Sequence, residues 1–146
     1  MFVGVIPLFD VNAKVLFDSG TTHSFLASSF VQTHKLEVTK DTKGWYISIP
    51  TGINQVAEWV CKRCPITLGH LTLPATMIVL EMKDFDIILG MYWMSKYYAF
   101  IDCRHKKVIF EIPGEGTCYY EGIRSQTPEA VSTRFTCMLA ETSNEG

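Results

Sequence analysis

Short apolar runs that alternate with turn signals constrain this chain more than any other feature. From residue 2 to residue 112 these runs are rich in β-branched and aromatic residues. This pattern is typical of a mostly β domain with many short strands, and it favours a barrel. The predicted strands are Phe2 to Leu8, Ala13 to Asp18, Gly44 to Ile49, Gln55 to Cys61, Cys64 to Leu68, Leu71 to Leu80, Asp86 to Leu89, Ala99 to Asp102 and Lys107 to Ile112.

Two short helices are expected between the strands. The first is predicted near residues 24–34, where apolar residues recur at a helical spacing. The second follows Gly90, where Met91, Met94 and Tyr98 lie three and four residues apart, so that one face would pack inward. Each helix comes after a strand and a glycine, which indicates internal pseudo-symmetry.

The length of 146 residues fits one domain with a sizeable core. From Pro113 onward the regular alternation of apolar runs and turn signals is lost, and Gly, Glu, Ser and Thr become more frequent. We therefore predict a single-lobe domain over residues 1–121, followed by a loosely ordered linker or tail over residues 122–146.

Composition narrows the classes of partner. A net charge of −2 without a basic run argues against nucleic acid. The first nine residues lack a charged lead and end at Asp10, unlike a signal peptide, and no apolar stretch approaches the roughly 18 residues of a membrane span. Five cysteines, an odd number, fit a reducing compartment better than a disulfide framework. We expect a cytoplasmic protein that binds neither nucleic acid nor membrane.

One carboxylate stands where a predicted strand ends. Asp18 follows the apolar run Val15 to Phe17 and opens the turn Asp18-Ser19-Gly20, in which glycine supplies permissive backbone angles. The tripeptide alone leaves two interpretations open, a functional carboxylate or one that only accepts hydrogen bonds from its own turn. About seventy residues downstream, a second apolar run, Asp86 to Gly90, also ends in glycine. This second run favours the functional interpretation.

In order and spacing, segments between residues 3 and 113 resemble the retropepsin-like aspartic proteases, in particular the protease domain of plant Gypsy-class LTR retrotransposon polyproteins. The resemblance implies a closed single-lobe β-barrel and an aspartic endopeptidase that processes a retroelement polyprotein, in the cytoplasm or within retroelement particles. The segments that carry it are Val15 to Phe25, Val60 to Ile66, Met77 to Leu80, Asp84 to Met94 and Ala99 to Cys103.

The carboxylate count predicts a homodimer. Hydrolysis of this kind needs two carboxylates that share one proton, because like charges in contact cannot both ionise. The chain contains one Asp-Ser-Gly and no second Asp-Ser-Gly or Asp-Thr-Gly. An isologous interface would place Asp18 beside Asp18 of a partner, as the resemblance also implies. The expected substrate is a polypeptide, and no metal or cofactor is expected.

The resemblance assigns roles to the other residues of the turn. Ser19 would bond across the dimer axis, and Gly20 would let the two turns approach each other closely. Thr21 stands where many relatives have alanine, and Thr22 matches the usual hydroxyl residue after it.

Two further segments belong to the predicted site. Pro50, Thr51 and Gly52 fall where a flap hairpin would cover the substrate, although an ordinary surface turn would look the same. The second apolar motif consists of Ile88, Leu89 and Gly90.

Tyr92, shortly after this motif, replaces the aspartate that is common in the family, which puts activity in more doubt than fold.

Three alternatives remain beside this prediction. Cys61 and Cys64 have the spacing of half a zinc site, but the other half is missing, so a pair of thiols that sometimes oxidise is favoured. His23 is interpreted as a structural residue, because Ser24 lacks the glycine pattern of a nucleophile elbow. The alternative function is a catalytically inactive, retroelement-derived module for dimerisation or peptide binding.

Overall fold

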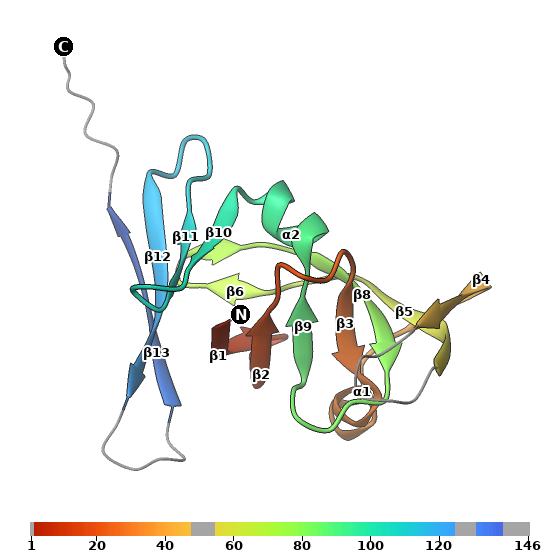
Figure 1. Cartoon of the computed structure of the whole chain (residues 1–146). Coiled ribbons are helices and arrows are strands. Elements are labelled where there is room, and N and C mark those ends of the chain that lie inside the picture. The colour runs from red at the N-terminus through yellow and green to blue at the C-terminus, as the bar shows by residue number, and fades with distance from the viewer. Residues whose placement is uncertain (1, 48–54, 125–130, 139–146) are drawn as a thin grey trace.

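The computed structural model describes residues 2–47, 55–124 and 131–138 (Figure 1). Within these ranges the chain is mostly β with two short helices, as predicted, and neither helix is long and apolar enough to span a bilayer. The elements are β1 (Phe2–Leu8), β2 (Val11–Phe17), β3 (Ser24–Ala27), α1 (Ser28–His34), β4 (Thr39–Ile47), β5 (Gln55–Cys64), β6 (Thr67–Leu68), β7 (Leu71–Thr72), β8 (Ala75–Leu80), β9 (Ile87–Leu89), α2 (Met91–Lys96), β10 (Ala99–Asp102), β11 (Lys107–Phe110), β12 (Thr117–Arg124) and β13 (Val131–Met138).

A seven-stranded sheet carries the segments of the predicted site. Its order is β1-β2-β9-β3-β8-β5-β4, with β2 parallel to β9 and β3 parallel to β8. β9 therefore lies between β2 and β3, although some seventy residues separate it from β2 in the sequence. Among the described residues β1 and β4 form the edges of this sheet, so the strand order does not show the closed barrel that was expected.

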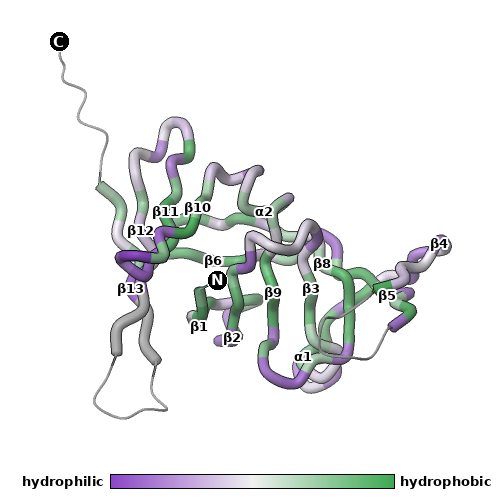
Figure 2. The backbone as a smooth tube through the Cα atoms, in the orientation of Figure 1, coloured by the Kyte–Doolittle hydropathy of each residue, from purple (hydrophilic) through white to green (hydrophobic). Residues whose placement is uncertain are grey.

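The main core lies where the seven-stranded sheet meets the second sheet, whose order is β10-β11-β12-β13. Figure 2 shows the hydrophobic character of the central strand β9. Tyr120 of β12 is buried, its ring centroid lies 5.5 Å from that of Phe17, and its hydroxyl donates to the carbonyl oxygen of Val5 at 2.5 Å. This residue ties the two sheets together, because it contacts both β1 and β2.

The first predicted helix begins later than expected. Residues 24–34 were predicted to be helical, but Ser24–Ala27 form strand β3 and α1 starts at Ser28. All four residues of β3 are buried, and they pair with β8 on one side and β9 on the other. Backbone pairing on both edges outweighs the helical spacing of the apolar side chains, because propensity is only a weak prior.

The second predicted helix is present as α2, but its buried face differs from the prediction. Met91 and Tyr98 are exposed, whereas Trp93 and Met94 are buried. The indole N–H of Trp93 donates to the carbonyl oxygen of Leu73 at 3.2 Å, which fixes this face against the core. The helix also ends before Tyr98, so helical spacing does not extend to that residue.

The segment predicted as a tail contains strand β13. Residues Val131–Met138 pair antiparallel with β12 along its whole length, and residue 121 lies inside β12. The ring of Phe135 packs edge-on against that of Phe110, with centroids 6.1 Å apart. The domain boundary at residue 121 stays a prediction.

The structure pairs four of the five cysteines, where the sequence favoured a reducing compartment over a disulfide framework and, for Cys61 and Cys64, thiols that sometimes oxidise. Cys61 is joined to Cys64, and Cys118 is joined to Cys137, which leaves Cys103 exposed and free. Cys118 and Cys137 are directly opposite in the register of β12 and β13. An odd cysteine count could not reveal this pairing, because the strands that create it were not predicted.

Candidate active site

Asp18 lies at the point where the buried strand β2 ends. Its amide donates to the carbonyl oxygen of Leu89 in the neighbouring strand β9 at 2.9 Å. Its carboxylate is half-buried, and Oδ1 accepts a hydrogen bond from the amide of Gly20 at 2.8 Å. The structural interpretation of Asp18 expected a hydrogen bond from its own turn, and this bond is present. It fixes the orientation of the carboxylate on a rigid base.

The two predicted motifs meet at this turn. The amide of Met91 donates to the carbonyl oxygen of Thr21 at 2.8 Å, and the amide of Tyr92 donates to that of Thr22 at 3.0 Å. The first residues of α2 thus hold the turn through main-chain hydrogen bonds. The departure at Tyr92 leaves this support in place, since the backbone and not the side chain supplies it.

Gly90 occupies the tightest position in this contact. A Cβ added to Gly90 would overlap the carbonyl oxygen of His23, and it would lie 2.8 Å and 2.9 Å from the carbonyl and hydroxyl oxygens of Thr21. Atoms at such separations must move apart. The lack of space for a side chain explains why this residue of the second motif is glycine.

A buried hydroxyl that the sequence did not single out completes the contact. Ser24 is 5% exposed, and its Oγ accepts a hydrogen bond from the amide of Gly90 at 3.1 Å. The two residues are 66 positions apart in the sequence. The only signal in the sequence was that Ser24 lies close to the turn. The hydrogen bond itself could not be predicted, because it depends on the pairing of β3 with β9.

Replacing Ser24 with alanine is expected to lower the free energy of unfolding by about 2 kcal/mol, because the buried Gly90 amide would lose its acceptor. Equilibrium unfolding in urea at a fixed protein concentration measures this change. Ser29→Ala, at an exposed position of α1, serves as the matched control and should alter stability little. Equal stabilities of the two variants would contradict the structural role of Ser24.

The remaining turn residues differ in exposure. Ser19 and Thr22 are exposed, as contact with a second chain would require. The hydroxyl of Thr21 lies 3.2 Å from the carbonyl oxygen of Asp18 and 3.4 Å from that of His23. Thr21 therefore braces the turn from within, whereas the roles given to Ser19 and Thr22 stay predictions.

The predicted flap tip, Pro50, Thr51 and Gly52, lies outside the described residues. The strands that lead to it are β4 and β5, which pair antiparallel up to Ile47 and Gln55. These two strands extend away from the body of the sheet at the β4 edge (Figure 1).

A second apolar cluster joins β3, β5 and β8, and no sequence motif pointed to it. Ile88 of the second motif packs against it, as do Trp45 and Ile47 of β4. The alternation of Ile78 and Leu80 along β8 is the signal that could have revealed part of it. Its buried members are Phe25, Ala57, Ile78 and Leu80. The half-buried residues packed against it, Trp45, Ile47 and Ile88, offer apolar surface between the flap strands and the predicted motif.

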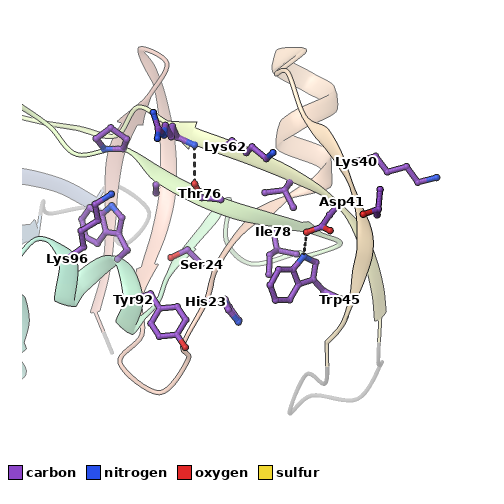
Figure 3. Close-up of a pocket in the computed structure, with 16 residues that line it drawn as sticks. His23, Ser24, Lys40, Asp41, Trp45, Lys62, Thr76, Ile78, Tyr92 and Lys96 are labelled. Carbon is purple, nitrogen blue, oxygen red and sulfur yellow. Dashed lines mark hydrogen bonds between the residues drawn. The ribbon is translucent and has the colours of Figure 1, made fainter.

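Next to the turn is a cavity of about 840 Å³ (Figure 3). Asp18 is not among the residues that line it, so the cavity is adjacent to the predicted catalytic position and does not contain it. His23 lies at its border, with its ring centroid 4.9 Å from that of Trp45 and 5.2 Å from that of Tyr92. These edge-on contacts fit the structural role predicted for His23.

The zinc alternative finds no support in the side chains. Cys61 and Cys64 are bonded to each other, and the described part of the chain holds no group of three or more His, Cys, Asp or Glu residues arranged to bind a metal.

Comparison with protein families assigns most of the chain. The family described as retroviral aspartyl protease matches residues 1–115. This range includes Asp18, both motifs and the strands that lead to the flap.

Two curated proteins and one solved structure are similar to the chain. The UBA domain-containing protein Mud1 of Schizosaccharomyces pombe is 28% identical over 61% of this chain and 26% of its own length, and DNA damage-inducible protein 1 of Neurospora crassa is 24% identical over 67% and 22%. The chain thus spans about a quarter of these relatives. The crystal structure of the retroviral protease-like domain of Ddi1 from Leishmania major matches with a TM-score of 0.59 and 18% identity, covering 76% of this chain and 88% of that domain. The fold is therefore retropepsin-like.

Proposed function

The chain belongs to the retroviral aspartyl protease family, and we propose that it is an aspartic endopeptidase that acts as a homodimer. The observation that carries the proposal is the position of Asp18, on a turn held by the Leu89 carbonyl and by the amides of Met91 and Tyr92. A catalytic carboxylate needs such a fixed base, because misplacement by 1 Å is costly to the reaction.

The proposed reaction uses Asp18 from each of two chains. One carboxylate is ionised and accepts a proton from a water molecule, whose oxygen attacks the carbonyl carbon of the scissile peptide. The other is protonated and donates a hydrogen bond to the carbonyl oxygen. Collapse of the resulting tetrahedral intermediate breaks the C–N bond, and the nitrogen leaves with a proton from the pair. The single Asp-Ser-Gly of the chain supports the dimer, since one protomer supplies only one of the two groups.

The proposed substrate is an extended polypeptide between the flap strands and the turn. The half-buried apolar residues Trp45, Ile47 and Ile88 suit the alternate side chains of such a peptide. The origin in a plant Gypsy-class element, and with it a retroelement polyprotein as substrate, comes from the sequence resemblance, whereas the cytoplasmic location comes from the composition and the cysteine count. The curated relatives are a UBA domain-containing protein and a DNA damage-inducible protein, so they support the family and not the element.

Mixing native and Asp18→Asn chains tests the proposal. If each active unit needs two Asp18 carboxylates, peptidase activity should fall as the square of the native fraction. An equal mixture should then retain about one quarter of the activity, the random share of dimers with two native chains. Activity is measured on a broad peptide library at constant total protein, after the chains have exchanged.

The control replaces Asp84, an exposed aspartate outside the site, with asparagine and should leave activity unchanged at every ratio. A fall to about one half in the equal mixture would mean that each chain acts alone, and a fall to only about three quarters would mean that one carboxylate per dimer is enough; either result contradicts the dimeric mechanism. A folded native dimer that cleaves no member of the library would favour the inactive peptide-binding module.

A further inference from the structure

The cavity beside the turn carries an excess of positive charge that the proposed chemistry does not use. The whole chain has a net charge of −2, yet four cations and one carboxylate line this cavity. The cations are Lys40, Lys62, Arg63 and Lys96, and the carboxylate is Asp41. In Figure 3, Lys62 lies above the centre of the cavity and Lys96 on the side of α2. Such a concentration of one sign in a concave site attracts anionic groups.

Most of this charge is not neutralised by the protein itself. Among the residues that the structure describes, Lys62, Arg63 and Lys96 have no ion-pair partner. Lys40 lies 3.9 Å from Glu58, but both side chains are more than half exposed, so this pair is weak.

The carboxylate of the cavity is already occupied by local hydrogen bonds. Asp41 Oδ1 accepts from the amide of Lys43 at 2.9 Å, and Oδ2 accepts from the indole N–H of Trp45 at 3.2 Å. These bonds hold the carboxylate to its own strand. The cations therefore remain available to a ligand.

The backbone places two of the cations in an unusual way. The register between β5 and β8 shifts between Cys61 and Cys64, and the two residues inside this bulge are Lys62 and Arg63. Arg63 has a φ of +50°, and its amide donates to the hydroxyl of Thr76 at 3.2 Å. A left-handed backbone is disfavoured for arginine, so the bulge holds Arg63 in a conformation that it would not adopt by itself. Bulges re-aim side chains, and here both residues of the bulge line the cavity.

The cavity is adjacent to the proposed peptidase site. His23 and Ser24, which follow the catalytic turn, line its border. On the opposite side it is bounded by β4, the edge strand of the sheet that leads to the predicted flap. A peptide that lies between Asp18 and the flap strands therefore reaches this cavity when it continues past His23.

We propose that this cavity binds acidic side chains of the substrate, in a segment that flanks the scissile bond. The inference rests on the proposed peptidase function and specifies its substrate class as polypeptides with Asp or Glu in that segment. An acidic peptide fits better than a nucleic acid, because the net charge of the chain is negative and, among the described residues, the excess of cations gathers in this cavity.

Binding is measured with the Asp18→Asn chain, which cannot turn over its ligand, by fluorescence anisotropy. The probes are labelled peptides that share an apolar centre. One pair carries Glu or Gln before the centre, and a second pair carries Glu or Gln after it. The peptide with Glu on the side that reaches the cavity is expected to bind about tenfold more tightly than its Gln counterpart, because it gains charge-assisted hydrogen bonds. Added salt should reduce this preference.

Neutralising the cavity should remove the preference. Lys62→Gln and Lys96→Gln, which lie on different elements, should each bring the Glu and Gln affinities closer together, and the double variant should make them nearly equal. The matched control is Lys83→Gln, an exposed lysine outside the cavity, which should keep the full preference. Native-like unfolding of each variant confirms that a lost preference reflects lost charge.

The outcomes separate this inference from the proposed function. Equal affinity for the Glu and Gln peptides, or an equal loss in Lys83→Gln, would overturn the acidic preference. A single-stranded oligonucleotide that displaces the Glu peptide more strongly than an unlabelled acidic peptide of equal charge would overturn it in favour of nucleic acid. Cleavage by the native chain without any Glu preference would reject the cavity assignment alone. A retained Glu preference in a chain that cleaves nothing would reject the peptidase alone.

Discussion

Replacing Asp18 with asparagine is expected to lower the peptidase kcat/KM by about 10³-fold or more, because the change removes the acid and base functions together. In a homodimer a single substitution alters both members of the pair. Asparagine can neither accept the proton of the attacking water nor return it to the leaving nitrogen. The assay compares initial rates of native and variant protein on the best peptide from the library.

The same substitution should leave the fold almost unchanged. The side-chain oxygen of asparagine can still accept the hydrogen bond that the Gly20 amide gives to Asp18 Oδ1. Unfolding curves of native protein and variant should therefore superimpose within about 0.5 kcal/mol. A variant that keeps its activity would show that another group performs the chemistry, and a variant that unfolds would leave Asp18 a structural residue of its turn.

Replacing Gly90 with alanine is expected to lower the free energy of unfolding by about 3 kcal/mol, at the upper end of overpacking effects. The backbone of Gly90 is extended, with a φ of −101°, so alanine is not strained by its conformation. The loss of stability comes from steric overlap alone, since the new methyl group meets the oxygens of Thr21 and His23. Because those residues belong to the catalytic turn, activity should also fall at temperatures where the variant is still folded.

Gly114 provides a contrasting control. Its φ is +87°, and a Cβ there would have no neighbour within 4 Å. Gly114→Ala should cost about 1 kcal/mol through backbone strain, without any loss of activity. If Gly90→Ala were no more destabilising than Gly114→Ala, the close contact between the second motif and the turn would be contradicted.

The sequence could predict the two motifs because each is contiguous. Asp18-Ser19-Gly20 and Ile88-Leu89-Gly90 are readable as runs of neighbouring residues, and their order suggested that they work together. The structure brings them into contact through the pairing of β2 with β9. The mostly β content was readable for the same reason, since most strands up to residue 112 contain a short apolar run.

Features made by distant residues could not be predicted in this way. Ser24 was assigned to a helix, because its burial in β3 depends on β8 and β9, which come much later in the chain. Strands β12 and β13 were missed, although Tyr120 is a main part of the core. The charge of the cavity is equally hidden, because Lys62 and Lys96 come from different elements and no sequence motif joins them.

The main-chain bonds between the Asp18 turn and α2 also have a consequence for the time at which this turn becomes ordered. During synthesis Asp18 leaves the ribosome about seventy residues before Met91 and Tyr92, whose amides hold its turn. A nascent chain therefore carries the carboxylate long before it can orient it. The turn can be held in this way only after residue 92 has been made, so its order is set late in synthesis.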